Sequence, residues 1–262
     1  MNKMIILLVI AIVFLHMCLI WLWYRYTNNP SVVDVGWASG LTLAGLVYLN
    51  NQGPSLRSLL LSLALLVWGV RLGGYLWWTR IRLQKVDKRY LALSSNWKLA
   101  KPLGFFLNFQ LQGALICLVS IPWYFSSSKT QTTLNLLDTL GLIMFLTAII
   151  LETAADYQLQ NFKKNYPGKV CNQKLWRYCR HPNYFYEWLV WCSFTLFALS
   201  APYGWIAIIS PLTLYLVMTR ITAPMTEQGS IESRGTLYIE YQKVTPMFFP
   251  KWLKIARRRE KN

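Results

Sequence analysis

The chain has 262 residues, of which 55% are hydrophobic, and it carries 13 Trp and a formal net charge of +17. This apolar content excludes an ordinary soluble domain and indicates a polytopic membrane protein. The charge would point to nucleic acid only if the basic residues formed one soluble face, so their position along the chain has to be established first.

Apolar runs long enough to cross a bilayer, about 20 residues each, occur seven times along the chain. They cover residues 4–24, 32–50, 57–79, 103–126, 134–155, 183–200 and 202–222. We therefore predict an all-α membrane protein of about seven transmembrane helices. Residues 1–262 are expected to form a single membrane-embedded domain, with an N-terminal half at about 1–126 and a C-terminal half at about 134–262.

Lys and Arg are concentrated in alternate connections between these runs. Segments 25–31, 80–101, 156–182 and 223–262 hold 22 of the 27. With seven spans these segments lie on one side, which the positive-inside rule makes cytoplasmic, so the N-terminus lies outside. In a bacterium the membrane would be the inner one. The basicity then reflects a cytoplasmic cap and argues against nucleic acid, and the tail 251–259 is expected to lie on acidic headgroups.

The second run begins near Asp34, which is either the N-cap of that helix or the carboxylate that pairs with Arg71. Arg71 lies well inside the third run, where a guanidinium is costly unless it is paired or faces a polar cavity. It is therefore a candidate site residue, although its side chain could also snorkel to the surface. Tyr75 and Arg82 continue the same helical face, which predicts a polar stripe toward the cytoplasmic end.

Asn108 and Gln112 share one face of the fourth run, where amides commonly join helices and ligand binding is the alternative. Glu152 and Asp156 lie one turn apart at the end of the fifth run. These acids invite ion pairs with the basic loop that follows, and they could equally accept hydrogen bonds from ribose hydroxyls or a nicotinamide amide.

Residues 177–187 separate the basic loop from the sixth run. Pro182 suits the first turn of a helix, since its missing N–H costs nothing there. Asn183 and Glu187 then lie one turn apart on one helical face. This polar pair is either part of a cofactor pocket or an interfacial anchor. The convergence of polar residues on the cytoplasmic side favours the pocket.

The chain has no GxGxxG, P-loop or GxSxG motif and only two histidines. A nucleotide would therefore be held within a helical bundle, and no metal site is predicted.

Several motifs together resemble the steroid 5α-reductase-like membrane proteins, closest to their bacterial branch of unknown function. The signature is Trp-Arg-Tyr-x-Arg-His-Pro-Asn-Tyr-Phe-x-Glu at 176–187. The supporting motifs are Asp34-x-x-Trp37, Trp68-x-x-Arg71-Leu72, Asp87-x-Arg89-Tyr90 and the Glu-rich ending from Glu227 to Pro250. The resemblance covers about residues 31–252.

The resemblance implies a seven-helix enzyme that uses NADPH to reduce a carbon–carbon double bond conjugated to a ketone. It implies a small hydrophobic substrate, such as a 3-oxo-Δ4 steroid or another lipid, and we expect a monomer. The resemblance implies cofactor contacts at Arg71, Tyr75, Arg82, Glu152, Asp156, Lys163, Lys169, Asn183 and Glu187. Two further candidates, Arg234 and Tyr238, come from the helix-like stretch near the C-terminus.

The catalytic candidates are Asp34, Tyr75 and Trp68. Trp68 stands where the animal enzymes have a substrate-facing tyrosine, and a Trp cannot donate a proton to an enolate. Protonated Asp34 or Tyr75 could instead donate to the carbonyl oxygen, where one good donor contributes ~3–4 kcal/mol.

Two other functions are compatible with the sequence. One is an S-adenosylmethionine-dependent methyltransferase of the isoprenylcysteine or phospholipid type, because those enzymes share the Arg-His-Pro-x-Tyr element. The basic cap favours a ligand with several phosphates over adenosylmethionine, which is a cation at sulfur. The other is a non-catalytic lipid-binding protein, against which the buried Arg71 and the Asn183–Glu187 pair argue.

Overall fold

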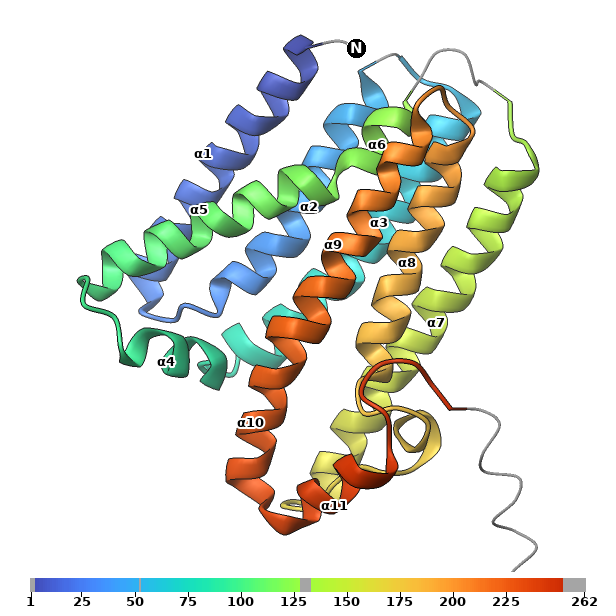
Figure 1. Cartoon of the computed structure of the whole chain (residues 1–262). Helices are drawn as coiled ribbons and strands as arrows, with labels where there is room; N and C mark the ends of the chain where they lie inside the picture. The colour runs from blue at the N-terminus through green and yellow to red at the C-terminus, as the bar shows by residue number, and fades with distance from the viewer. Residues whose placement is uncertain (1–2, 52, 128–132, 252–262) are drawn as a thin grey trace, which may run out of the picture. The chain divides into compact units, whose positions relative to one another are not determined.

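The computed structural model describes residues 3–51, 53–127 and 133–251. Within these ranges the chain forms helices and no strand, which confirms the predicted all-α class (Figure 1). Six helical segments are long and apolar enough to cross a membrane, as expected of a multi-pass membrane protein. They are Lys3–Thr27, Val32–Asn50, Leu56–Ile81, Lys101–Ser126, Leu136–Asn165 and Gly204–Arg234.

The remaining predicted span, 183–200, corresponds to helix α8 (Pro182–Leu199). It is helical as predicted but is not one of the six. Its first two turns contain Asn183 and Glu187, which lower the apolar character of the helix.

Two predicted spans differ in detail from the helices that form. The fourth is divided into α5 (Lys101–Val119) and α6 (Ile121–Ser126). Pro122 causes this break, since it has no N–H to continue the helical ladder. The fifth span continues well beyond the predicted end at 155, because α7 covers Leu136–Asn165. Asp156 and Lys163 therefore lie on one continuous helix.

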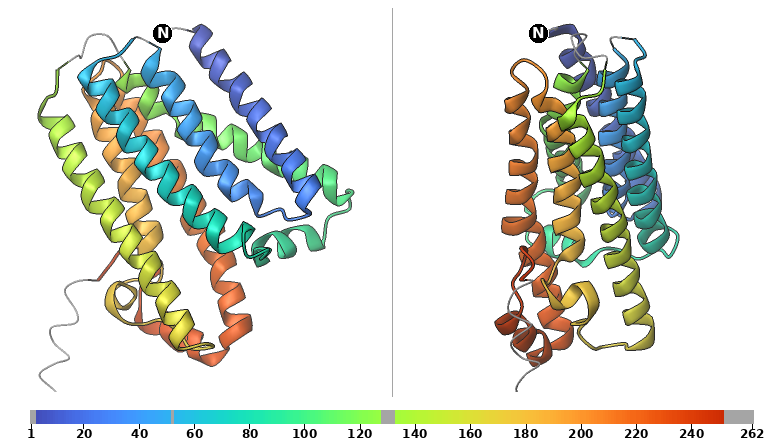
Figure 2. Two further views of the ribbon diagram at one scale, coloured as in Figure 1. Left: turned by 180° about the vertical axis from the view of Figure 1, so that it is seen from behind. Right: turned by 90° about the vertical axis from the view of Figure 1, so that its right-hand side faces the viewer.

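The chain divides into two compact units. Unit 1 comprises residues 1–141 and 194–211. In it α2 (Val32–Asn50) packs against α1 (Lys3–Thr27), α3 (Leu56–Leu76) and α5 (Figure 2). Glycine permits this close approach: a Cβ at Gly45 would lie 2.4 Å from the Leu65 side chain. The unit also contains a π-helical turn, η1 (Trp77–Ile81), and the short helix α4 (Lys88–Ser95).

Unit 2 comprises residues 142–193 and 212–262, in part beyond the described ranges. It holds most of α7, the first two-thirds of α8, and a nearly continuous helical segment. That segment consists of most of α9 (Ile209–Val217), η4 (Met218–Thr222) and α10 (Ala223–Arg234). Gly235, with φ +57°, then turns the chain into α11 (Thr236–Val244). That the whole chain acts as one domain stays a prediction.

A buried ion pair in unit 1 was not anticipated. The side chains of Arg57 and Asp138 are each 1% exposed, with Arg57 Nε 3.0 Å from Asp138 Oδ1. The guanidinium also donates to the carbonyl oxygens of Ser126 and Phe197. Arg57 thus ties the start of α3 to three other segments. Both residues lie near ends of apolar runs, and a charged side chain at such a position needs a partner.

Candidate functional site

The start of α8 is built as the sequence predicts. Pro182 is its first residue, and the carbonyl oxygen of His181 accepts the first helical hydrogen bond, from Phe185 N at 3.1 Å. Asn183 and Glu187 follow one turn apart on the same side of the helix. Their positions therefore depend on how the Arg180-His181 segment is held.

Glu227 on α10 holds that segment through a dense set of charged hydrogen bonds. Arg180 donates from Nε to Glu227 Oε1 at 2.6 Å and from Nη2 to Oε2 at 3.1 Å. His181 Nε2 lies 2.9 Å from the same Oε1, and Gln242 Nε2 donates to Oε2 at 2.7 Å. The His181 ring also stacks on Tyr184, with 5.0 Å between ring centroids. This cluster holds the segment before the start of α8 against α10 and α11.

Asn183 reaches from α8 to α7. Its Nδ2 donates to Asp156 Oδ1 at 3.1 Å. Its Oδ1 is buried and has no hydrogen-bond partner among the described residues. An acceptor left without a donor in such a position costs about 1–3 kcal/mol. The geometry therefore offers one buried acceptor to a ligand that carries an N–H or O–H group.

Three carboxylates of unit 2 accompany this amide. Glu152, Asp156 and Glu187 are 3%, 4% and 7% exposed. Glu187 accepts a hydrogen bond from Trp191 Nε1 at 3.0 Å. Glu152 and Asp156 share one face of α7, as predicted. Buried acids of this kind suit a ligand rich in hydrogen-bond donors or one that carries positive charge.

Two other cofactor candidates of unit 2, Arg234 and Tyr238, belong to the α10–α11 region. Tyr238 is buried, which raises the pKa of its hydroxyl. Arg234 Nε donates to the carbonyl oxygen of Lys169 at 3.1 Å.

Lys169 and Lys163 have exposed side chains. Lys163 lies on the Asp156 face of α7, seven residues further along.

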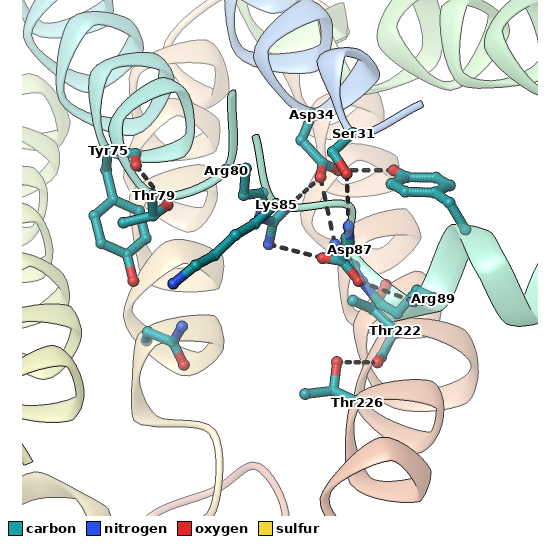
Figure 3. Close-up of polar contacts among 12 residues, drawn as sticks. Ser31, Asp34, Tyr75, Thr79, Arg80, Lys85, Asp87, Arg89, Thr222 and Thr226 are labelled. Atoms are coloured by element: carbon teal, nitrogen blue, oxygen red, sulfur yellow. Dashed lines mark hydrogen bonds and ion pairs between the residues drawn. The ribbon is translucent and has the colours of Figure 1, made fainter. Parts of the chain in front are cut away.

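In unit 1 the sequence predicted that Asp34 is either a helix N-cap or the partner of Arg71. The N-cap prediction is wrong, and the pairing with Arg71 stays a prediction. Ser31 is the N-cap of α2, and Asp34 lies in the first turn. Its carboxylate pairs with Arg80 and with Arg89 (Figure 3). The distance to Arg89 Nη2 is 3.5 Å. Tyr90 donates its hydroxyl to Asp34 Oδ1 at 2.7 Å. The carboxylate of Asp34 is thus already in contact with three protein groups.

Asp87 extends this charged cluster and fixes α4. Its Oδ1 accepts from Arg89 N at 2.9 Å, and Ser31 Oγ accepts from Asp87 N at 2.8 Å (Figure 3). Burial alone would raise the pKa of Asp87, but the hydrogen bonds and charge of Arg89 and the charge of Arg80 outweigh it and lower the pKa to about 2. The sequence motif contained Asp87, Arg89 and Tyr90, but nothing in it identified Asp34 as their partner.

The predicted stripe on α3 is only partly formed. The guanidinium of Arg71 lies 5.8 Å from the centroid of the Tyr75 ring, one turn away. Arg82 instead lies over the Trp78 ring at 3.8 Å. The intervening π-turn explains the difference, because it adds a residue to the turn and shifts the residues after it around the helix axis. Trp68, the third catalytic candidate, is fully buried in α3.

The structure therefore groups the candidates within each unit. Unit 2 holds Glu152, Asp156, Lys163, Lys169, Asn183, Glu187, Arg234 and Tyr238, and unit 1 holds Asp34, Trp68, Arg71, Tyr75 and Arg82. The sequence identified Glu227 only as the first residue of the Glu-rich ending, without a role. Its role could have been suspected from the basic pair Arg180-His181 beside the α8 start, which needs an acid. No cluster suited to a metal ion occurs within residues 3–51, 53–127 and 133–251.

Residues 20–245 match the family described as protein of unknown function (DUF1295). No curated protein and no solved structure matches the chain.

Proposed function

Because the chain belongs to the DUF1295 family, whose function is unknown, we propose a function from its own residues: NADPH-dependent reduction of a conjugated carbon–carbon double bond in a lipid. The observation that carries the proposal is the buried Oδ1 of Asn183, which has no hydrogen-bond partner among the described residues. The carboxamide N–H of nicotinamide, or a ribose hydroxyl, would supply the donor that this oxygen lacks.

The surrounding residues of unit 2 fit the same ligand. Carboxylates at Asp156 and Glu187 would accept hydrogen bonds from ribose hydroxyls, and Glu152 lies one turn before Asp156 on the same face of α7. The exposed cations Lys163 and Lys169 would meet phosphates. NADPH, when bound, supplies a hydride to the β-carbon of the enone, and a proton completes the reduction at the α-carbon.

The donor to the carbonyl oxygen of the substrate would come from the catalytic candidates Asp34 and Tyr75. Asp34 carries ion pairs with Arg80 and Arg89, so its carboxylate is the less suitable donor. Tyr75 is the remaining hydroxyl among the catalytic candidates. Trp68 would provide an apolar wall, since an indole has no acidic proton to give. We propose a steroid-like or other flat lipid as substrate, a cytoplasmic cofactor side and a monomeric enzyme.

A second function, methyl transfer from S-adenosylmethionine, is favoured by one specific observation. Glu152, Asp156 and Glu187 are three buried carboxylates in one unit. Such a set would complement the sulfonium cation of adenosylmethionine better than it would complement a phosphate. The choice between the two functions therefore rests on which ligand binds.

The purified full-length protein in a neutral detergent can be titrated with NADPH and, separately, with adenosylmethionine while its melting temperature is followed. We expect NADPH to stabilise the protein in a saturable manner, because a ligand that binds only the folded state raises its stability. Stabilisation by adenosylmethionine alone would overturn the reductase proposal. A response to neither ligand would favour a non-catalytic lipid-binding protein.

Reduction itself is tested with a 3-oxo-Δ4 steroid as probe. We expect loss of NADPH absorbance that depends on the steroid, and a product heavier by two hydrogens in mass spectrometry. NADPH binding without turnover of this probe would direct the search to other enones, whereas methylation of an added lipid would refute the proposal.

A further inference from the structure

Unit 2 contains a large groove, and Lys169 is the only residue of its lining that the proposed function uses. It has a volume of about 1450 Å³ and lies between the C-terminal turn of α7, the loop that leads to α8, and α11 with the segment after it. Phe162 in the last turn of α7 and Tyr166, the residue after the helix, form one of its walls. Every residue that lines it belongs to unit 2.

The groove is strongly basic. Four cationic side chains line it, Lys169, Arg177, Lys243 and Lys251, and all four are exposed. The single acid in the lining is Glu240, and Lys243 already pairs with it at 2.6 Å. The other three cations have no acid within the lining to balance them. An anionic group in the groove would be attracted by all three.

The same groove exposes apolar side chains beside its cations. Leu237 is 58% exposed, Val244 66% and Tyr166 49%. These three side chains give the groove an exposed apolar part. Together with the cations they form an amphiphilic surface, which suits a ligand that is charged at one end and apolar at the other.

Hydrogen bonds to backbone carbonyl oxygens hold the walls of the groove in place. Lys251 N donates to Tyr178 O at 3.1 Å, and Arg180 N donates to Pro246 O at 2.8 Å. The hydroxyl of Tyr241 donates to the carbonyl oxygen of Trp176. The segment after α11 is therefore fastened to the loop before α8. A site that is formed before its ligand arrives avoids part of the ordering cost of binding.

The groove is distinct from the Asn183 site, because the two use different faces of α7. Asp156 and Lys163 lie two turns apart on one face. Phe162 lies on another face, where it packs with Cys171 and Trp176. Only Lys169, which opens on the groove, was also a candidate for cofactor phosphates.

We propose that this groove binds the phosphate headgroup of an anionic phospholipid, with the exposed aliphatic side chains against the start of its acyl chains. Charge complementarity identifies the headgroup, since each Lys or Arg near an acidic lipid surface adds to the attraction. The inference does not depend on which reaction the protein catalyses.

The test uses the full-length protein in neutral detergent and two short-chain probes, dioctanoyl phosphatidylglycerol and dioctanoyl phosphatidylcholine. Apparent affinity is taken from the rise in melting temperature with lipid concentration. We expect the anionic lipid to bind at least about tenfold more tightly than the zwitterionic one. Equal binding of both lipids would overturn the proposal. An equal effect of inorganic phosphate at the same concentration would also overturn it, because the site would then take a soluble anion.

The variant Arg177→Glu/Lys251→Glu is expected to weaken the binding of phosphatidylglycerol at least about tenfold. The control variant Lys98→Glu/Lys101→Glu replaces two exposed lysines of unit 1 and alters the net charge equally. It should bind phosphatidylglycerol like the wild type. Arg177→Lys/Lys251→Arg keeps the charge and should also keep the binding. If the double Glu variant does not fold, Arg177→Gln/Lys251→Gln replaces it. Wild-type affinity in the folded variant would refute the site.

Discussion

The buried Arg57–Asp138 pair of unit 1 and the Asn183 cluster of unit 2 are both polar groups in apolar surroundings. Arg57 donates to a carboxylate and to two carbonyl oxygens, so its charge is fully surrounded by acceptors. Asn183 uses its amide nitrogen on Asp156 and leaves its oxygen without a partner among the described residues. The difference separates a polar group that holds the fold together from one that can receive a ligand.

The same contrast applies to the two networks of charged side chains. Asp34 in unit 1 accepts from Tyr90 and pairs with two arginines. Glu227 in unit 2 accepts from Arg180, His181 and Gln242. Both carboxylates are occupied by protein groups, so we assign them to support of the fold. Substitutions should therefore affect stability in the closed clusters and ligand binding at Asn183.

The largest expected effect is that of Arg57→Ala. We expect a loss of about 3–5 kcal/mol in the free energy of unfolding, because Asp138 would remain buried without its partner. Thermal or denaturant unfolding followed by circular dichroism measures it. Arg57→Met/Asp138→Leu removes both charges and should lose less, and Arg220→Ala, at an exposed site, should lose little. A loss below about 1 kcal/mol for Arg57→Ala would contradict the structural assignment.

Glu227→Gln is expected to cost about 2–3 kcal/mol of unfolding free energy, because neutral acceptors replace charged ones opposite Arg180 and His181. The same unfolding measurement applies. Glu232→Gln, about one turn further along α10 and exposed, serves as the matched control and should change stability little. Equal effects of the two substitutions would remove the special role given to Glu227.

Asp87 should make the free energy of unfolding depend on pH in the acidic range. Its pKa lies at about 2 in the folded protein and near 3.8 when unperturbed. The folded state therefore binds its proton less readily, so the stabilisation is present above about pH 4 and is lost as the pH falls toward 2. The shift corresponds to about 2 kcal/mol. Unfolding across this range should be less pH-dependent in Asp87→Asn than in the wild type, whereas Glu240→Gln should retain the wild-type slope.

The smallest effect on stability is expected for Asn183→Ala, below about 1 kcal/mol without ligand, since the change removes an unpaired oxygen together with one hydrogen bond. Its effect on ligand binding should be large, with NADPH affinity at least about tenfold lower in a thermal-shift titration. Glu187→Ala should act in the same direction. Asn161→Ala, on the exposed side of α7, is the control. Unchanged NADPH affinity in both site variants would refute the placement of the cofactor.

Local sequence was sufficient for much of the fold. The apolar runs at 4–24 and 32–50 became α1 and α2 with nearly the predicted ends. The α8 start at Pro182 followed from the geometry of proline alone. The end of α7 was wrong by ten residues, because a helix does not stop where its apolar character stops. In the candidate site, the Asn183–Glu187 pair was predicted from helical spacing, and Asp156 was predicted to lie on the same cytoplasmic side from the charge pattern and the family resemblance.

The sequence by itself determined which segments are helical and which polar residues share a helical face, because both follow from interactions within a few residues. Only the tertiary structure decided the partners of the charged groups. Arg57 and Asp138 are 81 positions apart, and Arg180 and Glu227 are 47 apart. Such pairs form only when packing brings distant segments together, and each charge had more than one possible partner before that. The open oxygen of Asn183 became visible in the same way, once its neighbours were known.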